Sequence, residues 1–154
     1  MQQTITWALE RRRTSLLRES FVLNLHKRMF GAVWRWAGTY RTSPKNLGVA
    51  PWDIRPELLT LRGDVQYWLD EQVYPPDELA VRFHHRLVQI HPFPNGNGRL
   101  SRLVGDLMIV RQGGERFTWG ATRLAAREAR THYINALRSA DASDISPLLS
   151  FARS

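Results

Sequence analysis

One short segment, residues 91–102, combines residue types that suit phosphate chemistry. It reads His-Pro-Phe-Pro-Asn-Gly-Asn-Gly-Arg-Leu-Ser-Arg, which gives one base, a run of small or amide residues, and two guanidinium groups. Residues 95–98 have short side chains or none, so their backbone can present several N–H groups toward one anion. Apolar residues recur at helical spacing from Arg99 onward, so this loop is predicted to lead into a helix N-terminus, which favours negative charge. Arg99 and Arg102 share one face of that helix and can bind one polyphosphate together.

His91 is the candidate general base of this segment. A neutral imidazole with an ordinary pKa of about 6.5 can accept a hydroxyl proton at working pH. A predicted helix runs into His91 and is stopped by Pro92, which disfavours α geometry in the residue before it. We therefore expect the base at a helix end. A capping histidine bonded to a nearby carbonyl is the structural alternative, and the loop that follows favours the functional interpretation.

The segment resembles the signature of the Fic family, His-x-Phe-x-(Asp/Glu)-Gly-Asn-Gly-Arg-x-x-Arg. It fills every fixed position except the acidic one, which is Asn95 here. Residues 25–30 and 36–41, and Tyr133 and Leu137 before Asp144, look like flanking elements of Fic domains, so the resemblance covers roughly residues 20–152. Within the family, the chain looks most like the bacterial branch called mobile mystery protein B.

The resemblance implies a role for each residue of the segment. His91 would deprotonate the attacking hydroxyl. The side chain of Asn97, with the backbone N–H groups of Gly96 and Gly98, would form an anion hole for the phosphate under attack. Phe93 is expected to point inward and pin the loop to the core. The expected nucleotide and phosphate contacts are Gly96, Asn97, Gly98, Arg99 and Arg102.

Asn95 departs from the family pattern at the position that concerns the metal. Most Fic enzymes have a carboxylate there, which binds the Mg²⁺ that bridges the nucleotide phosphates, and hard cations prefer charged oxygen ligands. Asparagine offers only a neutral carbonyl. Magnesium held mainly by the phosphates, a changed reaction and an inactive enzyme all stay open. We keep Asn95 as the candidate metal ligand, with ATP as the expected substrate and Mg²⁺ as the expected cofactor.

The resemblance implies a protein adenylyltransferase that moves AMP from ATP to a hydroxyl side chain of a target protein. The target would align as an added strand on a flap within residues 42–55. Transfer of another nucleotide, of phosphate or of phosphocholine is the alternative within enzymes. A noncatalytic basic nucleic-acid-binding domain is the alternative of another class, suggested by the net charge of +8 and the aromatic and arginine residues at 36–41. Core packing explains that stretch better, so nucleic acid is not an expected partner.

A restraining element is a further feature that the resemblance implies. Many Fic proteins carry an inhibitory helix with the pattern (Ser/Thr)-x-x-x-Glu-(Gly/Asn), whose glutamate pairs with the second motif arginine. Residues 15–20, Ser-Leu-Leu-Arg-Glu-Ser, nearly fit, which makes Glu19 the candidate inhibitory residue. Glu19 is close to the core-like segment that starts at Leu25, however, and inhibitory helices usually stand well upstream. Restraint by an antitoxin-like protein, or by residues outside this chain, is the alternative.

The elements that position these residues are predicted to be helical. A chain of 154 residues fits one domain, 1–154, and the resemblance predicts an all-α Fic-type bundle with a small β-hairpin flap. The segment over 4–19 is interpreted as a truncated element. Apolar periodicity predicts helices over 4–31 with an interruption near Thr14-Ser15, and over 57–72, 77–90, 98–112, 121–140 and 145–152.

Composition limits the cellular setting and the partners. Cysteine is absent, which excludes thiolate metal sites, and no apolar run is long enough for a membrane span or a signal peptide. We therefore expect a cytoplasmic protein without a membrane partner. Charge is uneven: residues 51–80 carry two Lys or Arg against seven Asp or Glu, and both flanking regions are basic.

Overall fold

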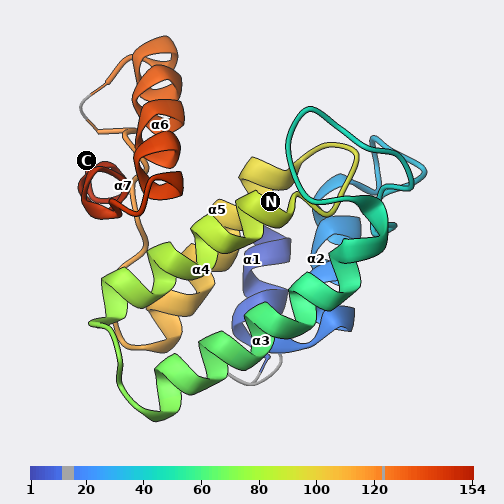
Figure 1. Cartoon of the computed structure of the whole chain (residues 1–154), viewed down its shortest axis with the longest axis horizontal. Coiled ribbons are helices and arrows are strands. Elements are labelled where there is room, and N and C mark those ends of the chain that lie inside the picture. Colours follow the sequence, from blue (N-terminus) through green and yellow to red (C-terminus); the bar gives the residue numbers. More distant parts are fainter. Residues whose placement is uncertain (12–15, 123) are drawn as a thin grey trace.

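The computed structural model describes residues 1–11, 16–122 and 124–154, and in these ranges the fold is built from helices without a β-strand (Figure 1). The predicted all-α class is therefore confirmed. None of the helices in the described part of the chain is long and apolar enough to cross a membrane. The helices are α1 (Gln2–Leu9), α2 (Glu19–Phe30), the 3-10 helix η2 (Pro51–Asp53), α3 (Ile54–Asp70), α4 (Pro76–Ile90), α5 (Asn97–Arg111), α6 (Ala126–Asp141) and α7 (Ser146–Ala152).

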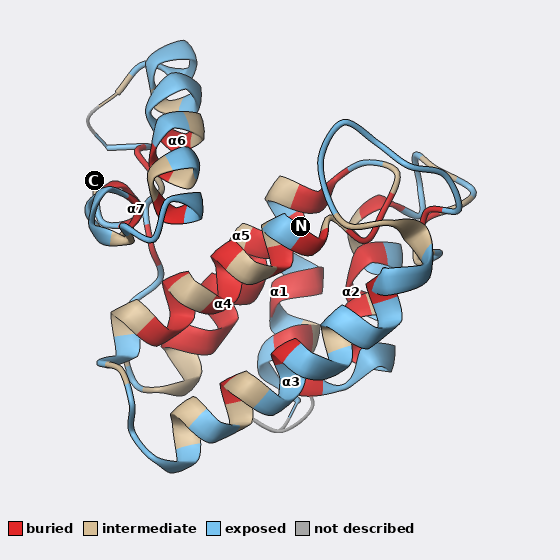
Figure 2. Cartoon of the chain, in the orientation of Figure 1, coloured by how far each residue is buried: buried red, intermediate tan, exposed pale blue. Residues whose placement is uncertain are grey.

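Helices α4 and α5 pack along each other at the centre of the fold and are the most buried elements (Figure 2). Gly105 lies at this contact, because a Cβ atom at that position would lie 3.3 Å from the Trp119 ring and 3.4 Å from the Cβ atom of His84 on α4. The loop between the two helices, residues 91–96, is therefore fixed at both ends by the core. The wholly buried apolar residues of α5 include Leu100, Val104, Leu107, Met108 and Ile109.

Helix α3 lies on the outside of the molecule and packs against α4 (Figure 2). Its buried residues, Ile54, Leu61 and Val65, are at most 2% exposed and supply its inward face. Most of its other residues are exposed. A long helix with a single apolar face is the expected form for an outer layer.

The predicted β-hairpin flap is wrong. Residues 42–50 form an irregular loop, joined to the end of α4 by isolated backbone bonds from Arg41 N–H to the Pro92 carbonyl (3.0 Å) and from Val49 N–H to the Ile90 carbonyl (3.3 Å). Pro44 has no N–H to donate, and Gly48 adopts a φ of +97°, so a regular ladder cannot run through the segment.

The N-terminal region, where the sequence predicts an interrupted helix over 4–31, contains two helices. Helix α1 ends at Leu9 and α2 begins at Glu19, so an interruption exists, although its predicted position near Thr14-Ser15 lies outside the described residues. Helix α1 is therefore shorter than the helical segment that the periodicity predicts before the interruption. Leu16 and Leu17 turn inward and are almost wholly buried, and Arg18 then takes an extended conformation before α2.

Helix α6 begins five residues later than the periodicity predicts. The N–H groups of Thr118 and Trp119 both donate to the Ala152 carbonyl at the end of α7, and Gly120 follows with a φ of +79°. The backbone of residues 118–120 is therefore bound to the end of α7, and the helix starts only after this segment.

Candidate active site

His91 occupies the C-terminal cap of α4 in the left-handed conformation, with φ 54° and ψ 59°. Pro92 excludes right-handed α geometry as predicted, but His91 is left-handed rather than extended. The last carbonyls of a helix lack partners within it, and here one guanidinium supplies them. Arg41, 3% exposed, donates to the carbonyls of His91 (2.6 Å) and Ile90 (3.2 Å), and also to that of Val49.

The surroundings of His91 hold its imidazole neutral. Burial lowers the pKa of His91 below its ordinary value of 6.5, and the positive charge of Arg41 lowers it further. A base must be unprotonated to accept a proton, so the ring is in the useful state at neutral pH.

Both polar atoms of the Asn97 side chain form hydrogen bonds inside the loop. Its side chain accepts a bond from Phe93 N–H (2.9 Å) and donates to the Phe93 carbonyl (2.7 Å), and the residue is 3% exposed. The expected anion hole included this side chain. The structure instead uses it to close the turn between residues 93 and 97.

His26 anchors the same loop from α2, a role that the sequence reasoning missed. Its ring is fully buried and stacks on Phe93, with centroids 3.8 Å apart. Gly38 N–H donates to Nδ1 (2.9 Å), so a neutral ring carries its proton on Nε2, which lies 3.0 Å from the Asn95 carbonyl and donates to it. Burial lowers the pKa of His26, which maintains this neutral form. No local pattern in the sequence indicates that residues 26 and 95 meet.

The two glycines of the loop have different surroundings. Gly96 has a φ of +83°, and a Cβ atom there would lie 2.7 Å from the Phe30 ring, so glycine alone fits. Its N–H donates to Asn95 Oδ1 (2.7 Å) and is not available to a phosphate. A Cβ atom at Gly98 would meet only Arg102 (3.8 Å) and the Tyr133 hydroxyl (4.0 Å) among the described atoms, so Gly98 keeps the space in front of Arg102 open.

The two motif arginines rest on aromatic rings. The Arg99 guanidinium lies 4.6 Å from the ring centroid of Phe30, and that of Arg102 lies 5.0 Å from the centroid of Tyr133. Such contacts hold a cation in place without neutralising it. The Tyr133 hydroxyl lies 3.1 Å from His84 Nε2, and burial raises the pKa of Tyr133 to about 12. Arg102 is therefore supported by an uncharged, buried platform.

A cavity of about 730 Å³ unites His91, the loop and the two arginines. None of the described residues that line it is Asp or Glu, while Arg130 of α6 adds a third guanidinium, so the cavity suits a polyanion. Its volume lies in the usual range for small-molecule sites. Apolar side chains complete its wall: Leu47, Val88, Pro94, Trp119, Ala126, Ala129, Ile134, Leu137 and Phe151.

Trp119 is a wall residue in the stretch between the two helices predicted over 98–112 and 121–140. It has a φ of +49°, which is uncommon for a bulky residue. Asp106, 4% exposed on α5, accepts a bond from Trp119 Nε1 (2.9 Å) and pairs with Arg116 (3.0 Å). A buried carboxylate thus fixes the ring at the edge of the cavity.

The residues present do not make a metal site by themselves. Asn95 is exposed, its Oδ1 already accepts the Gly96 N–H, and the described residues contain no group of three or more His, Cys, Asp or Glu that could hold an ion. Magnesium would therefore depend on ligands from the nucleotide.

Glu19 lies away from the cavity. Its carboxylate pairs with Arg55 of α3 at 3.0 Å, so the pairing with Arg102 that an inhibitory role requires is not formed in this structure. Ser15, the first residue of the candidate inhibitory pattern, lies outside the described residues.

Comparisons with known proteins agree with this architecture. The chain is 29% identical over 134 residues to the protein adenylyltransferase Fic of Aedes aegypti, an alignment that covers 84% of this chain and 26% of the relative. The chain thus spans about a quarter of that relative's length.

Solved structures of low sequence identity share the fold. A Fic-domain-containing signalling protein from Bacteroides thetaiotaomicron matches with a TM-score of 0.76 at 20% identity, over 97% of this chain and 65% of that one. BepC from Bartonella tribocorum, solved with bound AMPPNP, matches with a TM-score of 0.72 at 16% identity, over 98% and 80%. Membership of the mobile mystery protein B branch stays a prediction. A sequence model of the Fic/DOC family matches residues 16–109, more than half of the chain, and the chain therefore belongs to this family.

Proposed function

We propose that this domain transfers AMP from ATP to a hydroxyl side chain of a target protein. The observation that carries the proposal is a neutral, half-buried His91 that lines the same cavity as Arg99 and Arg102. Relatives named protein adenylyltransferase, and a structural neighbour with bound AMPPNP, support the nucleotide as the ligand.

The proposed reaction assigns each proton and bond. The target hydroxyl gives its proton to the free imidazole nitrogen of His91, and its oxygen attacks the α-phosphorus of ATP. The bond between the α-phosphorus and the bridging oxygen breaks, and pyrophosphate leaves. Arg99 and Arg102 hold the phosphates, and the backbone N–H groups at the start of α5 face the charge that grows on the α-phosphate. Asn97 acts here as a positioning residue.

The apolar part of the cavity wall suits the base and sugar of a nucleotide. Trp119 and, from α6, Ile134 and Leu137 provide apolar surface there. We assign the purine to this surface, because adenine has an apolar face and nucleotide sites combine such a surface with a few polar anchors. Leu47 lines the cavity from the 42–50 segment, which supports docking of the target on that side.

Labelling of proteins in a lysate with radioactive ATP tests the assignment of His91. His91→Ala should reduce transfer at least about a hundredfold, which is the usual contribution of a general base. His132→Ala is the matched control, because His132 is an exposed histidine of α6 that does not line the cavity. Equal labelling by His91→Ala and wild type would contradict the catalytic role.

Asn95 favours a second candidate function, the transfer of another phosphate-containing group. A neutral amide binds magnesium more weakly than a carboxylate does. A site with Asn95 would therefore depend less on a magnesium ion that bridges two phosphates, and it could accept group donors other than ATP. Mass spectrometry of one modified target separates the two functions. An added AMP supports adenylylation, while another nucleotide, phosphate or phosphocholine would replace it.

The partners follow from the same reaction. The target would lie against residues 42–50, where the exposed backbone of an irregular loop can pair with an extended segment. Restraint by an antitoxin-like protein remains our proposal for regulation, because Glu19 is paired with Arg55 instead of Arg102.

A further inference from the structure

Trp119 is held in the wall of the cavity in an uncommon backbone conformation. Its φ of +49° lies in the left-handed region, which bulky residues rarely adopt, and such conformations persist only where the surroundings impose them. They are concentrated at functional sites. The Trp119 N–H donates to the Ala152 carbonyl at 3.1 Å, so the end of α7 fixes the main chain. The position of the indole ring is determined separately, by α5.

Asp106 on α5 holds the indole ring through one carboxylate oxygen. Its Oδ1 atom accepts hydrogen bonds from Trp119 Nε1 at 2.9 Å and from the Phe117 N–H at 3.3 Å. Its Oδ2 atom pairs with Arg116 at 3.0 Å. The side chain of Asp106 is only 6% exposed, so its oxygens depend on these donors rather than on water. Asp106 is not among the described residues that line the cavity, and it would therefore act on a ligand through Trp119.

The rest of the indole ring packs against two aromatic side chains and a glycine. Its centroid lies 4.6 Å from that of His84 and 5.1 Å from that of Phe117. A Cβ atom at Gly105 would lie 3.3 Å from the ring, which is closer than an ordinary contact, so glycine leaves room for the ring. Trp119 is nevertheless only partly buried, and it lines the cavity. A flat aromatic surface, held in place by its neighbours, therefore borders the cavity that contains the motif arginines.

This surface suits recognition of a base by stacking rather than by hydrogen bonds. The only polar atom of the indole ring, Nε1, donates to Asp106. Stacking on an aromatic ring contributes to affinity because every base has a π face. Ile134 and Leu137 of α6 line the same cavity and have no polar side-chain atoms. The ring face of Trp119 is thus the feature of this wall that can hold a base in one orientation.

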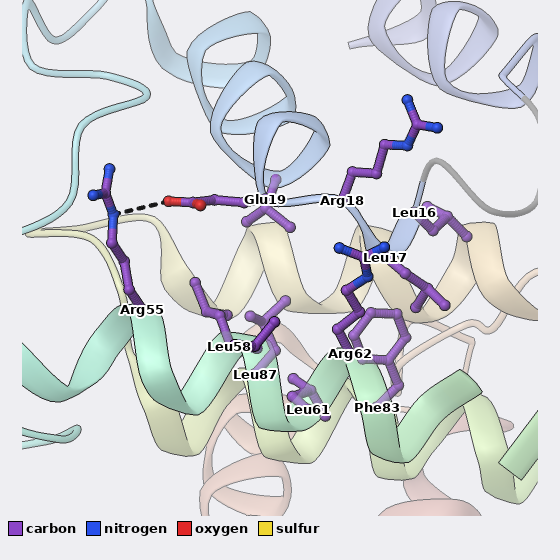
Figure 3. Close-up of a pocket in the computed structure, with 12 residues that line it drawn as sticks. Leu16, Leu17, Arg18, Glu19, Arg55, Leu58, Leu61, Arg62, Phe83 and Leu87 are labelled. Carbon is purple, nitrogen blue, oxygen red and sulfur yellow. Dashed lines mark ion pairs between the residues drawn. The ribbon is translucent and has the colours of Figure 1, made fainter. Parts of the chain in front are cut away.

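The recess between α2, α3 and α4 is a poorer place for a base. Its volume is about 100 Å³, and it shares no described lining residue with the cavity of about 730 Å³ (Figure 3). Small-molecule sites are several times larger than this recess. Glu19 pairs with Arg55 at its edge, at 3.0 Å (Figure 3). This pair resembles that of Asp106 and Arg116 but lies away from the cavity, so it provides a control.

We propose that the base of the nucleotide stacks on Trp119 and that Asp106 is the positioning residue that keeps the indole ring in place for it. The inference rests on the proposed function, because Arg99 and Arg102 would hold the phosphates of the same nucleotide. Asp106 follows Arg102 by four residues, so both lie on one face of α5. One helix then supplies a phosphate contact directly and supports the base through Trp119.

Calorimetric titration of the whole chain with ATP, and separately with inorganic tripolyphosphate in the same magnesium buffer, tests the stacking. Trp119→Ala should weaken ATP binding at least about tenfold, which is a usual contribution of one stacked base. Its affinity for tripolyphosphate should stay unchanged, because that ligand has no base. Trp52→Ala is the matched control, since Trp52 is an exposed tryptophan that does not line the cavity, and it should change neither affinity.

Substitutions of Asp106 test the positioning role. Asp106→Leu removes the acceptor and should weaken ATP binding without weakening tripolyphosphate binding. Asp106→Asn keeps an oxygen for Trp119 Nε1 and should retain most of the ATP affinity, and Glu19→Gln should change neither affinity. If Asp106→Leu does not fold, Trp119→Phe replaces it, because phenylalanine keeps an aromatic face but cannot donate to Asp106. That variant should bind ATP more weakly than wild type.

Fluorine NMR follows the ring itself. The chain has six tryptophans, and after labelling with fluorotryptophan the resonance of Trp119 is the one missing from Trp119→Phe. It should shift when ATP is added and stay in place with tripolyphosphate. Unchanged ATP affinity in Trp119→Ala, or equal losses for both ligands in Trp119→Ala and Asp106→Leu, would overturn the proposal. A wild type that binds ATP as described but transfers nothing would contradict the proposed function alone.

Discussion

The loop at residues 91–98 and the segment at residues 42–50 are both irregular, but they are held in different ways. The loop is stabilised from within, because Asn97 bonds to the backbone of Phe93 and the Asn95 side chain accepts the Gly96 N–H. The segment is exposed from residue 42 to 48 and is held from outside, by Arg41 and by two backbone bonds to the region of α4. A phosphate site needs fixed donors, whereas a docking surface needs backbone that is free to pair.

The largest difference should follow from a matched pair of asparagine substitutions. Asn97→Ala leaves the buried N–H and carbonyl of Phe93 without partners, so the free energy of unfolding should fall by about 2–4 kcal/mol. Transfer activity should be lost with it. Asn46→Ala in the exposed segment should change the free energy by less than about 0.5 kcal/mol. Urea denaturation measures both, and similar losses would remove the distinction between the two regions.

Acid should destabilise the fold through two buried histidines, His26 and His84. Burial lowers the pKa of His26, and it lowers the pKa of His84 to about 3. The unfolded chain takes up protons below pH 6.5 that the folded chain refuses, so stability is full above pH 6.5 and falls as the pH drops. His84 alone should lower the free energy of unfolding by about 2 kcal/mol at pH 5. Urea denaturation at pH 7.5 and pH 5 tests this, and equal values would refute it.

Alanine substitutions at two glycines with similar φ angles distinguish the effect of backbone strain from the effect of a close contact with His91. Gly48 and Gly113 have φ angles of +97° and +87°, so the backbone strain of alanine should cost about 1–2 kcal/mol at either position, and the close contacts at Gly48 should add to this cost. Only at Gly48 would a new Cβ atom reach His91, at 2.5 Å from its Cβ atom; at Gly113 it would meet no described atom within 4 Å. Gly48→Ala should therefore reduce transfer as well as stability, and Gly113→Ala should reduce stability alone. Equal transfer by both variants would show that residue 48 does not bear on the base.

The smallest effect should come from Asn95→Asp. Asn95 is exposed, and aspartate can still accept the Gly96 N–H, so stability should change by less than about 0.5 kcal/mol. An added charge should raise the affinity for magnesium with ATP, and labelling should increase at low magnesium. Calorimetric titration of magnesium in the presence of ATP gives a readout apart from activity. Identical curves for both proteins would show that residue 95 does not touch the metal.

Local pattern was enough to predict α3, α4, α5 and α7 and the position of the loop, although not the end of α1 or the start of α6. The residues of α4 and α5 repeat at helical spacing, Pro92 stops the first helix, and glycines precede the second, so each signal lies close in the sequence to what it determines. The predicted hairpin failed for the converse reason. Residues 42–50 owe their path to Arg41 and to carbonyls at positions 90 and 92, which no local pattern reveals.

The partners of the site residues were equally hidden. His26 and Asn95 meet through tertiary packing of α2 against the loop, and Asp106 reaches Trp119 across a turn that was interpreted only as a helix break. The family pattern also suggested that Asn97 faces the phosphate. Its side chain is used within the loop because a tight turn with a buried backbone needs its own donor and acceptor.

The guanidinium of Arg41 links the segment at residues 42–50 to the backbone of His91. The carbonyls of Val49, Ile90 and His91 all accept bonds from this one planar, almost wholly buried group. A rigid fork of donors keeps its acceptors at fixed separations. If a target docks on residues 42–50, as we propose, a force on that segment would move the backbone of His91 as well, and docking would then be coupled to the alignment of the proposed base.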